Sequence, residues 1–153
     1  MDLLRHVEQE LLDRERGITF DDAINLIQIP NDELLDLFAL ARKITLKHNG
    51  DGVFLRSIVN VKSGDCSENC SFCSQSVHYK TNISTYDMLD VDKVLEVALE
   101  SEKMGAFDLC LVMAVRSPNK RQFERILEYI KLIKRETTLL IGCSLGMLEE
   151  EQA

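Results

Sequence analysis

The chain of 153 residues has no tryptophan, only two prolines and seven glycines, and aromatic residues make up 6% of it. It has no surplus of basic residues, since its formal net charge is −8. A negative charge of this size repels phosphate backbones and anionic lipids, so we expect neither nucleic acid nor a membrane as a partner. No apolar run approaches the roughly 20 residues that a bilayer span requires. The first residues do not resemble a signal peptide, and we therefore expect a cytoplasmic protein.

What is present is the balance of an ordinary globular protein, with 45% hydrophobic and 29% charged residues. Five cysteines need a separate explanation. Disulfides are disfavoured in a reducing compartment, and an odd number cannot all pair within one chain. An isolated cysteine is most often a small buried apolar residue. That explanation fails for Cys66, Cys70 and Cys73, which crowd into a polar segment rich in turn-forming residues.

The first 50 residues are expected to form a helical cap. Leucines and valines recur there at helical spacing, and Gly17 ends the first helix. Thr19 followed by Asp22 resembles an N-cap, and either Asn31 or Asp32 is expected to cap the third helix. The predicted helices cover residues 1–16, 19–28 and 31–50. No residue of this segment suggests a chemical role.

From residue 51 to residue 153 the pattern changes to alternating strands and helices. Residues 107–113 form a nearly continuous apolar run, typical of a strand in a parallel sheet covered on both faces. Ser117 is expected to cap a helix that has Pro118 at its first position. Strands are predicted over 53–61, 107–113 and 137–143, helices over 90–105, 117–136 and from 149 onward, and a polar loop over 63–79.

This alternation predicts an α/β fold, namely a partial (β/α) TIM-type barrel made of three β/α units after an N-terminal helical segment. A closed barrel of this type has eight strands. The chain ends within an expected helix, so we expect a truncated chain or a fragment whose last strand leaves an edge unpaired.

The segment from Cys66 to Cys73 has the spacing Cys-x₃-Cys-x₂-Cys. A [4Fe–4S] cube has four irons, and each normally takes one thiolate. Three cysteines on one short loop leave the fourth iron without a protein ligand. The amino and carboxylate groups of S-adenosylmethionine can chelate that iron. An electron from the cluster would then cleave the S–C5′ bond and release a 5′-deoxyadenosyl radical. The spacing therefore predicts a radical S-adenosylmethionine site.

Two other metal sites use similar cysteine patterns. Structural zinc is held by four ligands, and His78 lies five residues after Cys73, where it could be the fourth. An electron-transfer ferredoxin needs a fourth clustered cysteine, which this segment lacks. The zinc alternative stays open at the level of the sequence.

The stretch from Ser57 to Tyr79 resembles the signature of biotin synthases, above all in its Lys-Ser-Gly lead-in and its Cys-Ser-Gln-Ser exit. This resemblance implies a radical S-adenosylmethionine sulfurtransferase that converts dethiobiotin to biotin by sulfur insertion, the last step of biotin biosynthesis. Phe72 stands where such enzymes have an aromatic residue near the adenine of S-adenosylmethionine. Alternatively, Phe72 has only a structural role and packs on the core to fix the loop in place.

Cys110 and Cys143 lie in the second and third expected strands. Alternate residues of such strands point into a barrel, and neighbouring strands are about 4.8 Å apart, so two inward cysteines can bind one small cluster. Without further information, two strand cysteines are more often core residues. The resemblance to biotin synthases implies that they are two ligands of a second, [2Fe–2S] cluster, the sulfur donor, whose other ligands lie beyond residue 153.

The same resemblance implies a flavodoxin- or ferredoxin-type electron donor and a homodimer at full length. The chain alone is expected to be inactive, because the remaining donor-cluster ligands and a substrate-binding segment would follow residue 153. Two alternatives remain open: another radical S-adenosylmethionine enzyme, of the hydrogenase-cofactor maturase or amino-acid mutase type, and a non-enzymatic zinc-binding cysteine-loop domain.

Overall fold

A computed structural model describes residues 2–152 of the chain. The chain divides into two compact units, with the division between Val53 and Phe54. The sequence analysis had placed this boundary between Gly50 and Asp51.

The N-terminal unit consists of short helices around a small apolar centre. Its elements are α1 (Asp2–Glu8), which continues into the π-helical turn η1 (Gln9–Asp13), then α2 (Phe20–Ile27), the 3₁₀ turn η2 (Asn31–Glu33) and α3 (Leu34–Asn49). The buried centre contains Leu4, Val7 and Leu40. Helices are thus present in each of the three predicted segments, although the first is shorter than expected and ends in a π-helical turn.

One of the two predicted caps in this unit is confirmed. The Thr19 hydroxyl accepts a hydrogen bond from the Asp22 backbone N–H at 3.1 Å, and the Asp22 carboxylate accepts one from the Thr19 backbone N–H at 3.0 Å. The prediction that Asn31 or Asp32 caps the third helix is wrong. Both residues lie inside η2, because the chain first forms a 3₁₀ turn after Pro30, and α3 begins only at Leu34.

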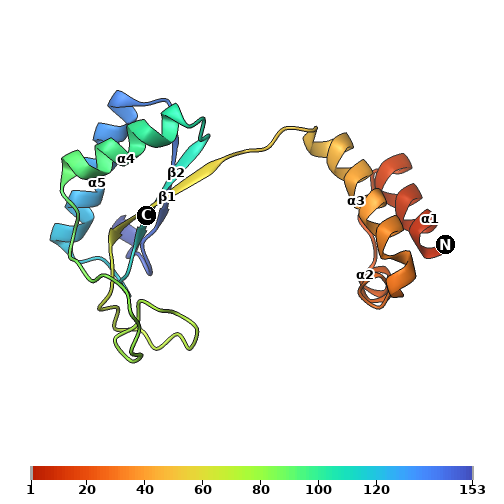
Figure 1. Ribbon diagram of the computed structural model, residues 1–153, viewed down its shortest axis with the longest axis horizontal. Coiled ribbons are helices and arrows are strands. Elements are labelled where there is room, and N and C mark those ends of the chain that lie inside the picture. The colour runs from red at the N-terminus through yellow and green to blue at the C-terminus, as the bar shows by residue number, and fades with distance from the viewer. Residues whose placement is uncertain (1, 153) are drawn as a thin grey trace. The chain divides into compact units, whose positions relative to one another are not determined.

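The second unit contains the three predicted strands, of which the first two are each followed by an α-helix. Where a helix was predicted from residue 149 onward, the described residues form only a 3₁₀ turn after the third strand. Its elements in chain order are β1 (Arg56–Lys62), α4 (Val91–Lys103), β2 (Asp108–Met113), α5 (Lys120–Glu136), β3 (Leu140–Ser144) and the 3₁₀ turn η3 (Glu150–Gln152). The strands form one parallel sheet in the order β1-β2-β3, with α4 and α5 as the connections (Figure 1). This is the start of a (β/α) barrel. None of the helices within residues 2–152 has the length and apolarity needed to cross a membrane.

The two faces of this sheet differ in character. One, which we call the helix face, packs against α4 and α5. Its residues, which lie in the strands or directly beside them, are Val59, Val61, Leu109, Leu111, Met113, Leu139, Ile141 and Leu145. Leu109 and Leu111 are fully buried, which stabilises the fold by about 1.5–3 kcal/mol for each side chain. The other, which we call the open face, carries the alternate residues Ile58, Asn60, Cys110, Val112 and Gly142, and Ile58 is 63% exposed.

Helix α5 begins later than the sequence analysis expected. Its N-cap is Asn119, whose side-chain oxygen accepts a hydrogen bond from the Gln122 backbone N–H, while the Gln122 side chain accepts one from the Asn119 backbone N–H, both at 3.0 Å. The prediction of Ser117 as N-cap with Pro118 at the first helical position is therefore wrong. The reciprocal pair between Asn119 and Gln122 satisfies two backbone donors at once, which moves the start of the helix past Pro118.

Candidate metal centre

The cysteine loop follows β1 at the carboxyl end of the sheet and is closed by backbone hydrogen bonds. The Cys66 N–H donates to the carbonyl of Gln75 at 3.0 Å, and the Val77 N–H donates to the carbonyl of Cys66 at 2.9 Å. Within the loop, the Cys73 N–H donates to the carbonyl of Cys70 at 3.0 Å. These bonds bring the first and the last cysteine of the motif onto one compact turn structure.

Ser76 is a buried polar residue, only 5% exposed, whose side chain forms two hydrogen bonds within this turn. Its hydroxyl donates to the Glu68 carbonyl at 2.6 Å and accepts from the His78 N–H at 3.2 Å. In the sequence, Ser76 stands out only as the last residue of the Cys-Ser-Gln-Ser motif. Its structural role could not be read from the sequence, because its partners lie two and eight residues away along an irregular loop.

The lead-in and the exit of the motif are bound to each other. The Gln75 side-chain oxygen accepts hydrogen bonds from the Gly64 N–H at 2.5 Å and from the Ser63 hydroxyl at 3.2 Å. Gly64 has a φ of +77°, and a Cβ there would lie 2.5 Å from the Thr85 hydroxyl oxygen. Glycine is therefore required for both its backbone angle and its size. The Lys62 ammonium donates to the Gly64 carbonyl at 2.8 Å, which extends this network into the sheet.

The three loop cysteines line one cavity of about 370 Å³ at the carboxyl ends of the three strands. Together with them, its walls are formed by Asn60, Lys62, Glu68, Gln75, Val112, Met113, Ala114, Val115, Arg116, Gly146 and Met147. The loop after β1 and the residues following β2 and β3 thus enclose one space. The cysteines were predictable from the sequence, whereas the rest of this wall was not, because it comes from segments far apart in the chain.

Residues after β2 and β3 are joined at the rim of this cavity. The Met147 N–H donates to the Arg116 carbonyl at 2.7 Å. Gly146 has a φ of +77°, and a Cβ there would overlap the same carbonyl oxygen. The Arg116 guanidinium also lies 3.1 Å from the Glu68 carboxylate, which connects β2 to the cysteine loop. The cavity is therefore built by specific contacts between its three contributing segments.

The donor chemistry of this cavity fits an iron–sulfur cluster. Three thiols from one loop line a space whose wall also includes the charged side chains of Lys62, Arg116 and Glu68, and cysteine thiolates are the ligands that hold iron–sulfur clusters. Within residues 2–152, no group of three or more histidine, cysteine or acidic side chains is gathered closely enough to hold a metal ion. In a [4Fe–4S] cube each thiolate binds a different iron, so its cysteine ligands do not converge on one point. The absence of a converging group therefore applies to sites for a single metal ion and not to a cluster.

The zinc alternative gains no fourth ligand from His78. Its Nε2 atom lies 3.2 Å from the Ser67 carbonyl oxygen, and the residue is absent from the walls of the cavity that the cysteines share. A structural zinc site needs four ligands in a tetrahedron around one ion. Among the described residues, the wall of this cavity contains no histidine and no fourth cysteine beside the three of the loop.

Phe72 does not anchor the loop on the core, because it is 95% exposed. The packing alternative for this residue is therefore wrong. Its ring is free to stack on another planar group, and contact with an adenine stays a prediction.

The two strand cysteines do not share a face of the sheet. Cys110 is in register with Gly142, and Cys143 is in register with Leu111, whose side chain is fully buried on the helix face. The expectation that both cysteines point inward is thus not met, since a shift of one residue reverses the direction of every side chain in a strand. Cys143 is exposed as a residue. Atoms packed around its sulfur nevertheless raise the pKa of its thiol, and Cys110 adds to this shift.

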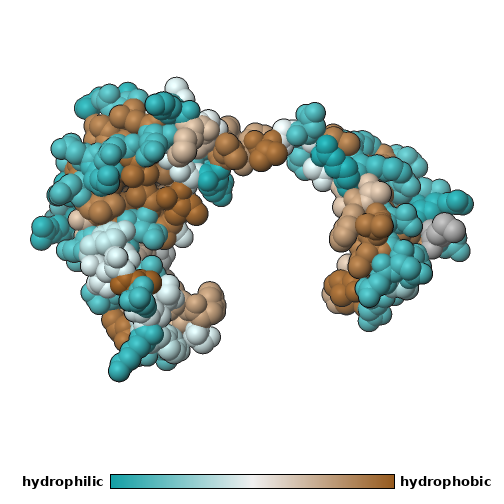
Figure 2. Space-filling model, in the orientation of Figure 1, coloured by the Kyte–Doolittle hydropathy of each residue, from teal (hydrophilic) through white to brown (hydrophobic). Residues whose placement is uncertain are grey.

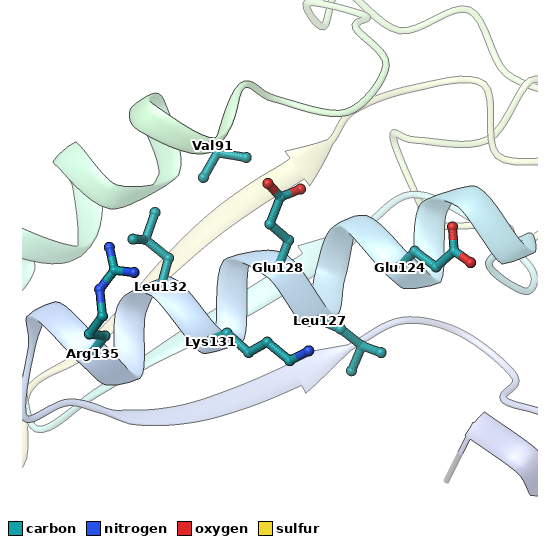
Figure 3. Close-up of a pocket in the computed structure, with 7 residues that line it drawn as sticks. All are labelled: Val91, Glu124, Leu127, Glu128, Lys131, Leu132 and Arg135. Carbon is teal, nitrogen blue, oxygen red and sulfur yellow. The ribbon is translucent and has the colours of Figure 1, made fainter.

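A second cavity, of about 590 Å³, is a groove beside α5 (Figure 3). It is lined by Val91, Glu124, Leu127, Glu128, Lys131, Leu132 and Arg135. The charges along it are of both signs, and no cysteine or histidine lies in its wall. This is the composition of a solvated helix surface, so we assign the candidate site to the smaller cavity with the cysteines.

Comparison with known proteins shows similarity along the whole chain. No family model matches it. It is 44% identical over 155 residues to a biotin synthase of Acetivibrio thermocellus, a match that covers 100% of this chain and 47% of that protein. It is 35% identical over 151 residues to a biotin synthase of Mycobacterium leprae, a match that covers 99% of this chain and 44% of that protein. The chain thus spans about half the length of these curated relatives.

Among solved structures, the chain resembles a methylornithine synthase with a TM-score of 0.78. That match covers 98% of this chain and 42% of the other, at 22% sequence identity. At this level of identity the likeness establishes the fold alone. It supports the conclusion that the second unit is the beginning of a (β/α) barrel.

Proposed function

We propose that this chain, which fits the N-terminal part of a radical S-adenosylmethionine biotin synthase, binds a [4Fe–4S] cluster and takes part in the reductive cleavage of S-adenosylmethionine. One observation carries the proposal. Cys66, Cys70 and Cys73 line a single cavity at the carboxyl ends of the parallel strands. Ligands of α/β proteins bind characteristically at this edge of a sheet, where the loops after the strands converge.

The cysteines would hold the cluster through their thiolates, one iron each. When bound, the cluster supplies the electron that splits S-adenosylmethionine into methionine and a 5′-deoxyadenosyl radical. Lys62 and Arg116 place positive charge at the cavity, which suits the anionic carboxylate of S-adenosylmethionine.

Residues of the second strand and of the β3 exit supply the apolar part of the cavity wall. Val112, Met113 and Met147 lie there, and apolar walls exclude water from reactive species. Phe72 presents an exposed ring at the same loop, which suits contact with the adenine. The chain's own contribution is thus to bind, orient and shield.

For the whole protein we propose the conversion of dethiobiotin to biotin, with a flavodoxin- or ferredoxin-type electron donor, in a cytoplasmic homodimer. The support is the 44% identity to a curated biotin synthase across the full chain. Another radical S-adenosylmethionine enzyme, of the hydrogenase-cofactor maturase or amino-acid mutase type, is the second candidate, because the fold is shared with a protein of another name, a methylornithine synthase. A shared fold does not choose between these activities.

The proposal can be tested by anaerobic reconstitution of the 153-residue chain with iron and sulfide. We expect an oxygen-sensitive cluster with equal amounts of iron and acid-labile sulfide, and an electron paramagnetic resonance signal of the reduced protein that changes when S-adenosylmethionine is added. The Cys70→Ala variant should lose the cluster, because two thiolates remain. Cys143→Ala is the matched control and should keep it. Binding of zinc without sulfide, or unchanged iron in Cys70→Ala, would overturn the proposal.

A further inference from the structure

We infer that Cys143 does not ligate a cluster together with Cys110, and that the residue of the third strand that faces Cys110 is Gly142. This goes beyond the proposed function, since it concerns the strands rather than the loop cavity. It disagrees with the [2Fe–2S] pair that the resemblance to biotin synthases implies for Cys110 and Cys143.

The register of the sheet is the first argument. β2 and β3 are paired in parallel over five consecutive positions without a bulge, from Asp108 with Leu140 to Val112 with Ser144. Cys110 pairs with Gly142 inside this regular segment, and Cys143 pairs with the next residue, Leu111. Partners in a parallel ladder point to the same face, while successive residues alternate. The two cysteines are therefore directed to opposite faces.

Burial supports this assignment independently of the register. Leu139 and Leu145, which flank β3, are buried in the core that packs on α4 and α5, and Ile141 of β3 is partly buried against that core, so the odd-numbered residues of this segment face the helices. Cys143 stands within that series. On β2, Leu109 and Leu111 are fully buried in the same core, whereas Cys110 between them is only partly buried. Cys110 consequently lies on the open face.

The surroundings of Gly142 provide the third argument. A Cβ built on Gly142 would lie 3.7 Å from the Cys110 sulfur, which is ordinary van der Waals contact. A side chain at this position is thus compatible with the sheet and would meet Cys110 directly. The place that a second cysteine ligand would need is occupied by a glycine.

A cluster bound by both strand cysteines would have to contact thiolates on opposite sides of a continuous backbone. The residues present do not fit this arrangement. Cys110 is then the one thiol that these two strands present on the open face. A sulfur-donor cluster built on Cys110 and Cys143 is accordingly not part of the chemistry we assign to this chain.

Thiol bridging tests this inference without any cluster. In a background with Cys66, Cys70 and Cys73 replaced by alanine, only Cys110 and Cys143 remain. The comparison variant carries Gly142→Cys and Cys143→Ala in the same background. Both are treated under reducing, anaerobic conditions with a bifunctional bimane, which becomes fluorescent when one molecule joins two neighbouring thiols. We expect the reagent to bridge Cys110 and the new thiol in the Gly142→Cys variant. We expect no bridge between Cys110 and Cys143 in the other chain.

Each outcome decides a part of the inference. Equal bridging in both chains would overturn the exclusion of Cys143, and absence of bridging in both would overturn the assignment of Gly142. A monofunctional thiol reagent under denaturing conditions counts the thiols in each variant. Should the triple background fail to fold, the same two comparisons are made with the loop cysteines intact, and mass spectrometry identifies the bridged peptides. Because no iron is used, failure here leaves the proposed loop cluster untouched, and failure of that cluster leaves this result valid.

Discussion

The cysteine loop after β1 and the strand β3 both present cysteines at or near the same end of the sheet, yet different forces position them. In the loop, hydrogen bonds over a few residues hold Cys66 and Cys73, and Ser76 and Gln75 supply the partners. In β3, the direction of Cys143 depends on which residue of β2 it stands beside. The spacing of cysteines along the sequence therefore indicates which thiols lie together in the loop. In the strand, the position of a cysteine in the sequence does not show which side chain of the neighbouring strand it lies beside.

The largest effect in this comparison is expected on the strand side, at Leu111. This fully buried residue is the register partner of Cys143, and its truncation leaves a cavity between the sheet and α5. Leu111→Ala should lower the free energy of unfolding by about 2–5 kcal/mol. Urea unfolding followed by circular dichroism measures this. The control is Cys143→Ala, for which we expect a much smaller loss, because Cys143 is exposed although it lies on the same face as Leu111. A loss as large as that of Leu111→Ala would contradict this difference in burial.

A smaller loss is expected where the β3 exit meets the loop cavity. Gly146→Ala forces a Cβ against the Arg116 carbonyl at a φ of +77°, and we expect a cost of about 1–3 kcal/mol together with reduced cluster loading. Gly142→Ala is the matched control, because its Cβ meets the Cys110 sulfur only at 3.7 Å. Iron content after reconstitution and the urea midpoint are measured for both variants. Equal losses in the two variants would contradict the specific need for glycine at position 146.

On the loop side, Ser76→Ala removes a hydroxyl that donates to the Glu68 carbonyl and accepts from the His78 N–H. We expect a loss of about 1 kcal/mol and a faster release of iron to a chelator, since the turn that carries the cysteines is less constrained. Ser74→Ala, at an exposed position of the same loop, serves as the control. Identical iron release from both variants would indicate that backbone hydrogen bonds alone hold the loop.

The smallest effect is a pH dependence of α2 in the N-terminal unit, where positioning is also local. Hydrogen bonds from Thr19 lower the pKa of Asp22, and His6 lies 3.6 Å from the same carboxylate. A carboxylate with a pKa lowered in the folded state stabilises that state above its unfolded pKa, and this contribution is lost as the pH falls through the lowered value. Helical circular dichroism between neutral and acidic pH should show this loss, and Asp22→Ala should flatten it, whereas Asp21→Ala should not.

The two units also differ in how completely their apolar side chains are covered. Phe20 and Ile27 of α2 are 78% and 81% exposed, and apolar surface is visible on both units in Figure 2. The buried centre of the N-terminal unit is small, while the β/α unit has a continuous core between the sheet and its two helices. Truncation of a core side chain should therefore lower the free energy of unfolding more in the β/α unit than in the N-terminal unit.

Several features could be predicted because they depend on neighbours in the sequence. The Thr19 cap, the alternation of strands and helices and the three-cysteine loop are of this kind. Other local features failed where two signals competed. Ser117 and Asn119 are both good N-caps, and Asn119 prevailed because Gln122 completes the reciprocal pair. The first strand begins at Arg56, and not at Val53, because its pairing with β2 starts where Arg56 stands beside Asp108.

The sequence by itself determined the β/α order of this protein and the three thiols of one loop, because periodicity and short spacing act between residues close in the chain. Only the tertiary structure decided which side chains meet across strands. It brought Met113, Arg116 and Met147 to the cysteine cavity, and it placed Gly142 instead of Cys143 beside Cys110. The reason is that side chains of a strand alternate with a period of two, so that a register difference of one residue, invisible in the composition of either strand, moves a thiol to the opposite face.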